Sequence, residues 1–454
     1  MTTSSSTYPS SSQTNATETK EANSFTRIGS FESNDRKITF NWNISSVNEE
    51  TPLPALTVVP HYFSGNDIQQ IANALFDDAE YYELGPKSSR QLSKAEIENR
   101  IALIEPYLDE NQRKNTLRSI YTELDVQNQL DMYLNAYSTA PDQYNYQTCD
   151  WTLKSEGYYN DTNSSGLGSG NTNKLEALAV TDVSDYYISV SVENAKKYQR
   201  NIISIQACDG TDPVLRDIKT ALMCQVTEPT FEQIDAVSEK AQNILNQIGL
   251  GEYAIIEAKE SPLTYGITPR YAISVKATQV MNGCPVISGQ SAITSGVDDL
   301  NTESDNEVRY PLTYIRFIFN PSGDLIEFTM EGITDIESVN CDTSESISLD
   351  SLCVAAENYL SKLNFDSFDA LTGNNAWQLS LFDDVPKEEL RFSVEINDMQ
   401  FGLARQDSST NNIYEYIPVA MLKGNISCID SEGNVLRECQ RALVLVSTID
   451  GSII

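Results

Sequence analysis

Few side chains in this sequence are suited to nucleophilic or metal chemistry. The 454 residues include a single histidine, His61, and eight cysteines, none of which forms a CxxC pair. Zinc and iron–sulfur sites need clustered thiolates or imidazoles, and a serine or cysteine nucleophile needs an imidazole or an equivalent base. His61 follows Pro60 at the junction of a predicted strand and a predicted helix, where a local hydrogen bond is the usual role of histidine. We therefore predict no catalytic residue, no metal site and no cofactor.

Two cysteines near the carboxyl end are spaced for a disulfide bond. Cys428 and Cys439 lie on either side of a predicted turn at residues 431–434. This turn sets Asp430 opposite Val435 and brings the two cysteines within two residues of facing each other. A disulfide needs Cα atoms within about 7 Å, so a small change of register allows the bond. The alternative is two thiols buried in the sheet, which is common for cysteine.

Carboxylates are too numerous for a catalytic pair to be located in the sequence. Glycoside hydrolases use two carboxylates whose separation is set by the fold, and 65 acidic residues provide many pairs. A hydrolase with such a pair in a cleft between domains is therefore an alternative function. Calcium binding is a further possibility from the carboxylates, because residues 430–434 and 209–212 each offer several oxygen ligands. Neither segment matches an EF-hand loop, and turn formation accounts for both.

The charge of the chain limits its partners. A net charge of −34 repels phosphate backbones and anionic lipid surfaces, so we expect no nucleic-acid partner. Neutral glycans, basic proteins and cations remain, although the charge can also serve solubility alone. The 23 tyrosines suit half-exposed sheets and peptide or glycan grooves, but plain strand propensity is the more usual reason for such an excess.

Helix signals and apolar periodicity indicate the elements that would position these residues. A helix over 67–80 carries Ile68 and Ile71 on one face, and the capping-box pair Ser93 and Glu96 opens another helix. One long polar-faced helix is expected over 109–137, and a Gly-, Ser- and Asn-rich loop over 155–173. These helices form a predicted helical subdomain beside a small sheet.

The second half repeats one order of elements. Thr230 and Ser348 each cap a helix with an apolar face, and strands of antiparallel type follow each helix. Because a helix followed by a meander occurs twice, we predict the α+β class, with antiparallel sheets each packed by a helix. The predicted domains are a disordered tether (1–36), an N-terminal α+β domain with a helical insertion (37–225), and two helix-plus-meander domains (226–340 and 341–454).

The amino-terminal segment suggests export. Residues 2–34 are rich in Ser, Thr, Asn and Glu, which favours a flexible tether. No stretch approaches the roughly 20 apolar residues of a membrane helix, and no secretory signal follows Met1. Either the protein is cytosolic, or an exported protein is present here without its signal. A tether directly after a lipid-modified cysteine would have this composition.

Three short segments resemble a known family. The closing run 442–454, with Asp450-Gly451-Ser452, resembles the last strand and turn of PepSY-like domains. The stretch 416–419 is similar to their entry strand, and the hairpin at 282–286 is similar to their other half. Over residues 35–454 the arrangement resembles uncharacterised exported lipoproteins of Gram-positive gut bacteria. The resemblance implies an extracytoplasmic protein held at the cell surface by an N-terminal lipid, without assigned catalytic residues, and the lipid-carrying cysteine is absent here.

These observations favour a non-catalytic surface protein that binds or modulates an envelope protein, a peptide or a glycan. PepSY-like domains imply, by resemblance, a regulatory role towards proteases or sensor kinases. We expect a monomer whose contact with the membrane is limited to the lost lipid anchor. The alternatives are the hydrolase described above and a structural spacer that holds another domain off the membrane.

Overall fold

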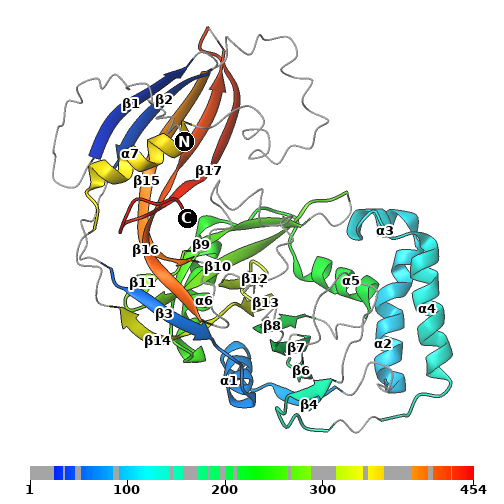
Figure 1. Cartoon of the computed structure of the whole chain (residues 1–454). Helices are drawn as coiled ribbons and strands as arrows, with labels where there is room; N and C mark the ends of the chain where they lie inside the picture. The colour runs from blue at the N-terminus through cyan, green and yellow to red at the C-terminus, as the bar shows by residue number, and fades with distance from the viewer. Residues whose placement is uncertain are drawn as a thin grey trace, which may run out of the picture.

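The strands of the protein form two sheets. The computed structural model describes residues 25–33, 36–45, 53–84, 92–143, 147–156, 171–182, 184–194, 201–207, 212–263, 267–287, 313–340, 346–361, 391–406, 413–430 and 432–454. One sheet has seven strands and the other has ten, and helices cover parts of both (Figure 1). The class is α+β, as the sequence predicts.

The helices within these residues are α1 (Gly65–Leu75), α2 (Lys94–Ile104), the 3-10 helix η1 (Glu105–Leu108), α3 (Glu110–Thr116), α4 (Glu123–Tyr137), α5 (Pro213–Met223), α6 (Phe231–Ile248) and α7 (Leu349–Leu360).

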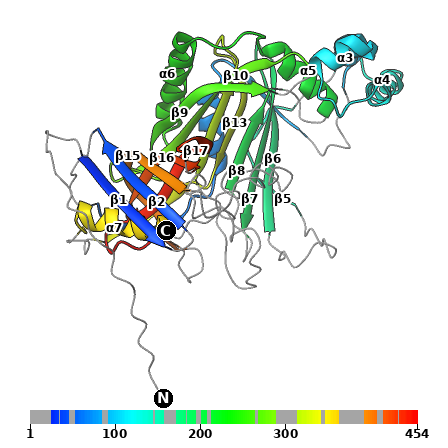
Figure 2. The same cartoon turned by 90° about the horizontal axis from the view of Figure 1, so that it is seen from above.

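The seven-stranded sheet runs in the order β1-β2-β15-β16-β3-β14, with β17 paired to β16 beside β3. Its strands are β1 (Phe25–Ser33), β2 (Arg36–Ile44), β3 (Ala55–Pro60), β14 (Thr334–Asn340), β15 (Arg391–Gln406), β16 (Tyr414–Ile429) and β17 (Val435–Ser447). The pair β2–β15 is parallel and the other pairs are antiparallel. Helix α7 packs Leu352, Cys353, Ala356 and Leu360 into the core of this sheet. Figure 2 shows α7 beside the strands of this sheet.

The ten-stranded sheet runs in the order β11-β10-β12-β13-β8-β7-β6-β4, with β9 paired to β10 and β5 to β6. Its strands are β4 (Glu80–Glu83), β5 (Lys154–Glu156), β6 (Asn171–Val180), β7 (Asp185–Asn194), β8 (Asn201–Gln206), β9 (Glu252–Leu263), β10 (Arg270–Met281), β11 (Cys284–Pro285), β12 (Tyr314–Phe319) and β13 (Leu325–Glu331). The apolar faces of α1 and α6 share one core with this sheet, and α6 lies beside β9 and β10 (Figure 2).

A helical subdomain stands at one side of the ten-stranded sheet, as predicted (Figure 1). Helices α2 and α4, η1 and α5 share its core, which includes Ile97, Leu130 and Leu215. The long helix expected over 109–137 is two helices, α3 and α4. Leu117 lies between them, buried and in extended conformation, and Thr122 begins α4 with a capping box.

The domain boundaries differ from the predicted ones because both sheets combine distant parts of the chain. Strand β2 lies beside β15, and β3 lies between β16 and β14. Strand β8 pairs with β13 in the other sheet. Each of these pairs joins segments that were assigned to different domains. The order of a helix followed by a meander does recur, but the units it suggests do not fold as separate sheets.

The tether prediction is wrong for part of its length. Within the segment 1–36, residues Phe25–Ser33 form β1, which pairs with β2 over nine positions. Phe25 and Phe31 pack against the core of the seven-stranded sheet, and Arg27 binds Glu357 of α7. These three contacts hold a segment that its Ser and Thr content marked as flexible. Residues 1–24 lie outside the described part of the chain.

A buried polar contact joins the two sheets. The Gln279 side chain of β10 donates to the Thr334 carbonyl oxygen (2.9 Å) and accepts from the Thr334 N–H (3.0 Å). Nearby, Ile287 N–H donates to the Leu403 carbonyl oxygen of β15 (2.7 Å). The sheets therefore meet through satisfied backbone groups, as buried polar atoms require.

Candidate functional site

A depression lined by uncharged amide side chains lies between α1 and α6. Its lining residues are Asn66, Gln69, Gln70, Asn73 and Ala74 of α1 and Gln247 of α6. The depression has a volume of about 420 Å³ and is broadly open to solvent. We call it the carboxamide depression. A carboxamide offers two N–H donors and one acceptor oxygen, so this surface can bind the donor and the acceptor atoms of hydroxyl or amide groups.

The sequence of α1 separates its two faces cleanly. Ser64 and Asp67 form a capping box that begins the helix. Ile68 and Ile71 are buried in the core shared with α6. The exposed residues of the helix repeat at helical spacing and are all Asn or Gln: Asn66, Gln69, Gln70 and Asn73. The helix therefore presents a row of carboxamides to solvent because its apolar stripe is held against the sheet.

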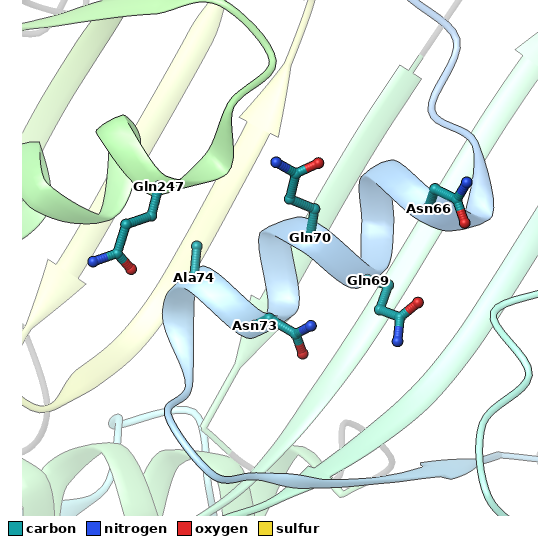
Figure 3. Close-up of a pocket in the computed structure, with 6 residues that line it drawn as sticks. All are labelled: Asn66, Gln69, Gln70, Asn73, Ala74 and Gln247. Carbon is teal, nitrogen blue, oxygen red and sulfur yellow. The ribbon is translucent and has the colours of Figure 1, made fainter.

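A glycine allows the two helices to meet at this depression. Helix α6 ends at Gly249 with φ of 70°, a left-handed conformation that favours glycine. A Cβ at Gly249 would lie 2.5 Å from the Gln70 amide nitrogen. Figure 3 shows Gln70 extending from α1 on the side of Gln247, while Gln69 and Asn73 extend from the other side of the helix. The amides of α1 thus extend from both sides of the helix in this view.

His61 anchors the start of α1 between two carboxylates. Its Nδ1 lies 3.0 Å from Asp335 Oδ2 of β14, and its Nε2 lies 3.6 Å from Asp67 Oδ2. The His61 carbonyl oxygen accepts from the Asn201 amide (2.6 Å). The hydrogen bond to Asp335, opposed by burial, raises the pKa of His61 above its usual value. The sequence predicts a local hydrogen bond for this histidine, but its hydrogen-bond partner Asp335 is 274 positions away in the chain.

We expect stability to depend on pH through His61. Because the folded-state pKa is raised, this contribution is fully present below the unfolded pKa of about 6.5 and disappears as pH rises through the folded value. The wild type should therefore lose unfolding free energy relative to His61→Gln as pH rises from 6 to about 8.5. Urea denaturation of both proteins across this range tests the expectation. Parallel curves at all pH values would contradict it.

A second pocket contains two carboxylates, as the hydrolase alternative requires. Asp217 of α5 and Glu327 of β13 line it, together with Arg118. Asp217 is 1 % exposed and accepts a hydrogen bond of 2.5 Å from Arg118 Nε. Asp217 is therefore already ion-paired. Of the two pocket carboxylates, only that of Glu327 has no ion pair within the described residues. This pocket is a poor match to the two working carboxylates of a glycoside hydrolase.

The predicted disulfide pair lies across β16 and β17. Cys428 is buried and stands opposite Arg437, and Cys439 stands opposite Ile426. The two cysteines are thus diagonal neighbours, two residues from facing each other. Diagonal neighbours have Cα separations of about 7–8 Å, which is longer than disulfides usually span. The bond stays a prediction that needs a change of register.

Other thiols and oxygen ligands have structural surroundings. Burial raises the pKa of Cys353 to about 12 and that of Cys224 to about 11, which keeps both thiols protonated and unreactive. The Asp430 carboxylate accepts from the Asn434 N–H and side chain, and Asp212 caps α5. Asp209 lies outside the described residues. Within those residues, no three His, Cys, Asp or Glu side chains are grouped to hold a metal ion.

The carboxamide depression was not among the sequence-based candidates. The sequence predicts the apolar stripe of the helix, and the Asn and Gln residues between the apolar positions are a signal for its polar face. The approach of Gln247, more than 170 positions away in the chain, needs the tertiary fold.

Comparison with known proteins identifies no family. No helix in the described part of the chain has the length and apolar character to cross a membrane. No protein-family model matches the chain, and no curated protein matches it. A crystal structure of an uncharacterised protein from Eubacterium rectale is similar over 94% of this chain and 93% of its own, at 8% identity and a TM-score of 0.37. No enzyme family is indicated by these comparisons.

Proposed function

We propose that this chain is a non-catalytic binding protein and that the carboxamide depression takes a neutral, hydroxyl-rich glycan. The observation that carries the proposal is the lining of five carboxamides without a charged residue, in a chain of net charge −34. Asn and Gln side chains pair with sugar hydroxyls as donor and acceptor at once. An extracytoplasmic location, which the family resemblance implies, would expose such a site to cell-wall and host-surface glycans.

Electrostatics favour a neutral ligand over an acidic one. The chain carries 65 acidic and 31 basic residues, so its field repels uronates, sialic acids and sulfated sugars. A strongly basic ligand would gain from the field, but the depression offers no carboxylate for it to pair with. An uncharged glycan is not repelled by the field of the chain and needs no carboxylate in the depression.

The proposal predicts which amides matter. We expect the full chain to bind neutral members of a glycan array, and the double variant Gln69→Ala, Asn73→Ala to bind them at least about tenfold more weakly, because two hydrogen-bonding groups are lost. Both positions are exposed on a helix, and alanine has the highest helix propensity, so folding should be unaffected. Calorimetric titration with the best glycan measures the change.

The matched control is Asn243→Ala, which removes an exposed carboxamide of α6 that does not line the depression. It should leave affinity unchanged. Failure of every neutral glycan to bind would overturn the proposed function. Equal binding by the double variant would place the glycan elsewhere and overturn the site.

A further inference from the structure

The pocket beside α5 has the groups that recognise a small zwitterion. Its lining includes Arg118, Arg216, Asp217, Leu263, Ile318 and Glu327, and it has a volume of about 180 Å³. Pockets for drug-sized ligands measure about 300–1,000 Å³, so this one suits a smaller molecule. The charges of its two guanidinium groups and two carboxylates sum to zero, so a ligand without net charge keeps the pocket neutral.

One cation and one anion of this pocket are held less firmly than the Arg118–Asp217 pair. Arg118 donates from Nε to Asp217 and from Nη2 to the Tyr121 hydroxyl (3.1 Å), so it is tied to the protein. Arg216 Nε lies 3.9 Å from Asp217 Oδ1, beyond hydrogen-bonding distance, and its side chain is 39% exposed. No ion pair engages Glu327 within the described part of the chain. Arg216, held only by this long ion pair, and Glu327 can therefore bind opposite charges on one ligand.

The fold places these two groups over an apolar surface. Glu327 of β13 pairs with Gln206 of β8 on one side and with Ile318 of β12 on the other, so the three side chains form a row across the sheet. Arg216 projects from α5, on a different element of the pocket wall. Ile318 is 5% exposed. A ligand held between the two charges would rest on this apolar surface.

We infer that this pocket binds a free α-amino acid with a small apolar side chain. The ligand carboxylate pairs with the guanidinium of Arg216, a group suited to carboxylates. The ligand ammonium group pairs with Glu327, and Ile318 and Leu263 contact the side chain. The site is separate from the carboxamide depression and does not depend on glycan binding.

Calorimetric titration of the full chain with L-valine tests the inference. We expect a Kd between about 10 µM and 1 mM, in keeping with so small a ligand. Isovalerate lacks the ammonium group and isobutylamine lacks the carboxylate, so each should bind at least about tenfold more weakly. Equal binding of isovalerate would make the pocket a plain anion site and overturn the inference. Absence of valine binding would also overturn it.

Two variants locate the ligand. Arg216→Gln and Glu327→Gln should each weaken valine binding at least about tenfold, and Glu327→Gln should leave the weak binding of isovalerate unchanged. Glu232→Gln makes the same charge change on the exposed first turn of α6, outside the pocket, and should bind valine like the wild type. Valine binding that survives both pocket variants would refute the site.

Discussion

Replacing Gly424 by alanine should destabilise the protein by about 3 kcal/mol, at the upper end of the range for overpacking. Gly424 lies in β16 opposite Ile396 of β15. A Cβ at this position would overlap the Glu395 carbonyl oxygen and lie 2.8 Å from the carbonyl carbon. These atoms are backbone, so no side chain can turn aside to make room. The two strands would have to separate and lose hydrogen bonds between them.

The reason for this close approach is a bend in the long hairpin. The register shifts between Ile396 and Asp398 on β15, and between Leu422 and Lys423 where β16 meets β17. Bulges of this kind bend a strand, and glycine is the residue that permits close backbone approach there. Figure 1 shows the β15–β16 hairpin curving from the region of α7 towards β3. Alanine at Gly424 would fill the space that the bend needs.

Urea denaturation followed by tryptophan fluorescence measures the effect. The matched control is Ser427→Ala, a half-buried position three residues further along the same strand. This change removes an atom instead of adding one, and it should shift stability by less than about 0.5 kcal/mol. A Gly424→Ala protein that unfolds at the same urea concentration as the wild type would refute the packing described here.

Local signals in the sequence predicted local structure well. The capping boxes at Ser93 and Thr230 open α2 and α6, because one side chain and the backbone three residues later suffice to define them. The Asn282-Gly283 turn likewise sits between β10 and β11. The α+β class follows from such elements alone, since class depends on their kinds and order.

Strand neighbours could not be predicted in the same way. Strand β2 pairs in parallel with β15, and Ile38 meets Phe392 from the far end of the chain. The apolar–polar alternation of either strand does not identify its neighbour, because many half-buried strands have a similar apolar face. The same limit applies to the sites: Arg118 and Asp217 are paired by the packing of a turn against α5. Each side chain alone is an ordinary charged residue.

Strand β1 shows why composition misled the tether prediction, and it leads to the second large effect. Arg27 donates from Nε and Nη2 to the two carboxylate oxygens of Glu357 on α7, each at 3.1 Å. Trp42 Nε1 of β2 donates to the same carboxylate at 2.9 Å. The side chains of Arg27 and Glu357 are 18% and 16% exposed. One carboxylate thus fastens an edge strand, its neighbour and the helix together.

Glu357→Ala should therefore destabilise the protein by about 3 kcal/mol, because it leaves a largely buried guanidinium and an indole N–H without their acceptor. Urea denaturation measures the total loss. Hydrogen exchange of the β1 amides should accelerate most, since β1 is the edge strand that Arg27 holds. Glu357→Gln keeps an acceptor oxygen for Trp42 and should fall between the alanine variant and the wild type.

Asp350→Ala is the matched control. It tests whether the loss comes from the buried contact with Glu357 or from the removal of any acidic group near Arg27. Asp350 contacts the same guanidinium from the same helix, but its side chain is 78% exposed. A solvent-exposed ion pair contributes at most about 1 kcal/mol, so this variant should cost much less than Glu357→Ala. Equal losses from the two variants would mean that charge near Arg27, and not the buried three-way contact, holds β1. A loss confined to Glu357 would show that its largely buried carboxylate adds to the packing of Phe25 and Phe31 in holding this Ser- and Thr-containing strand in the sheet.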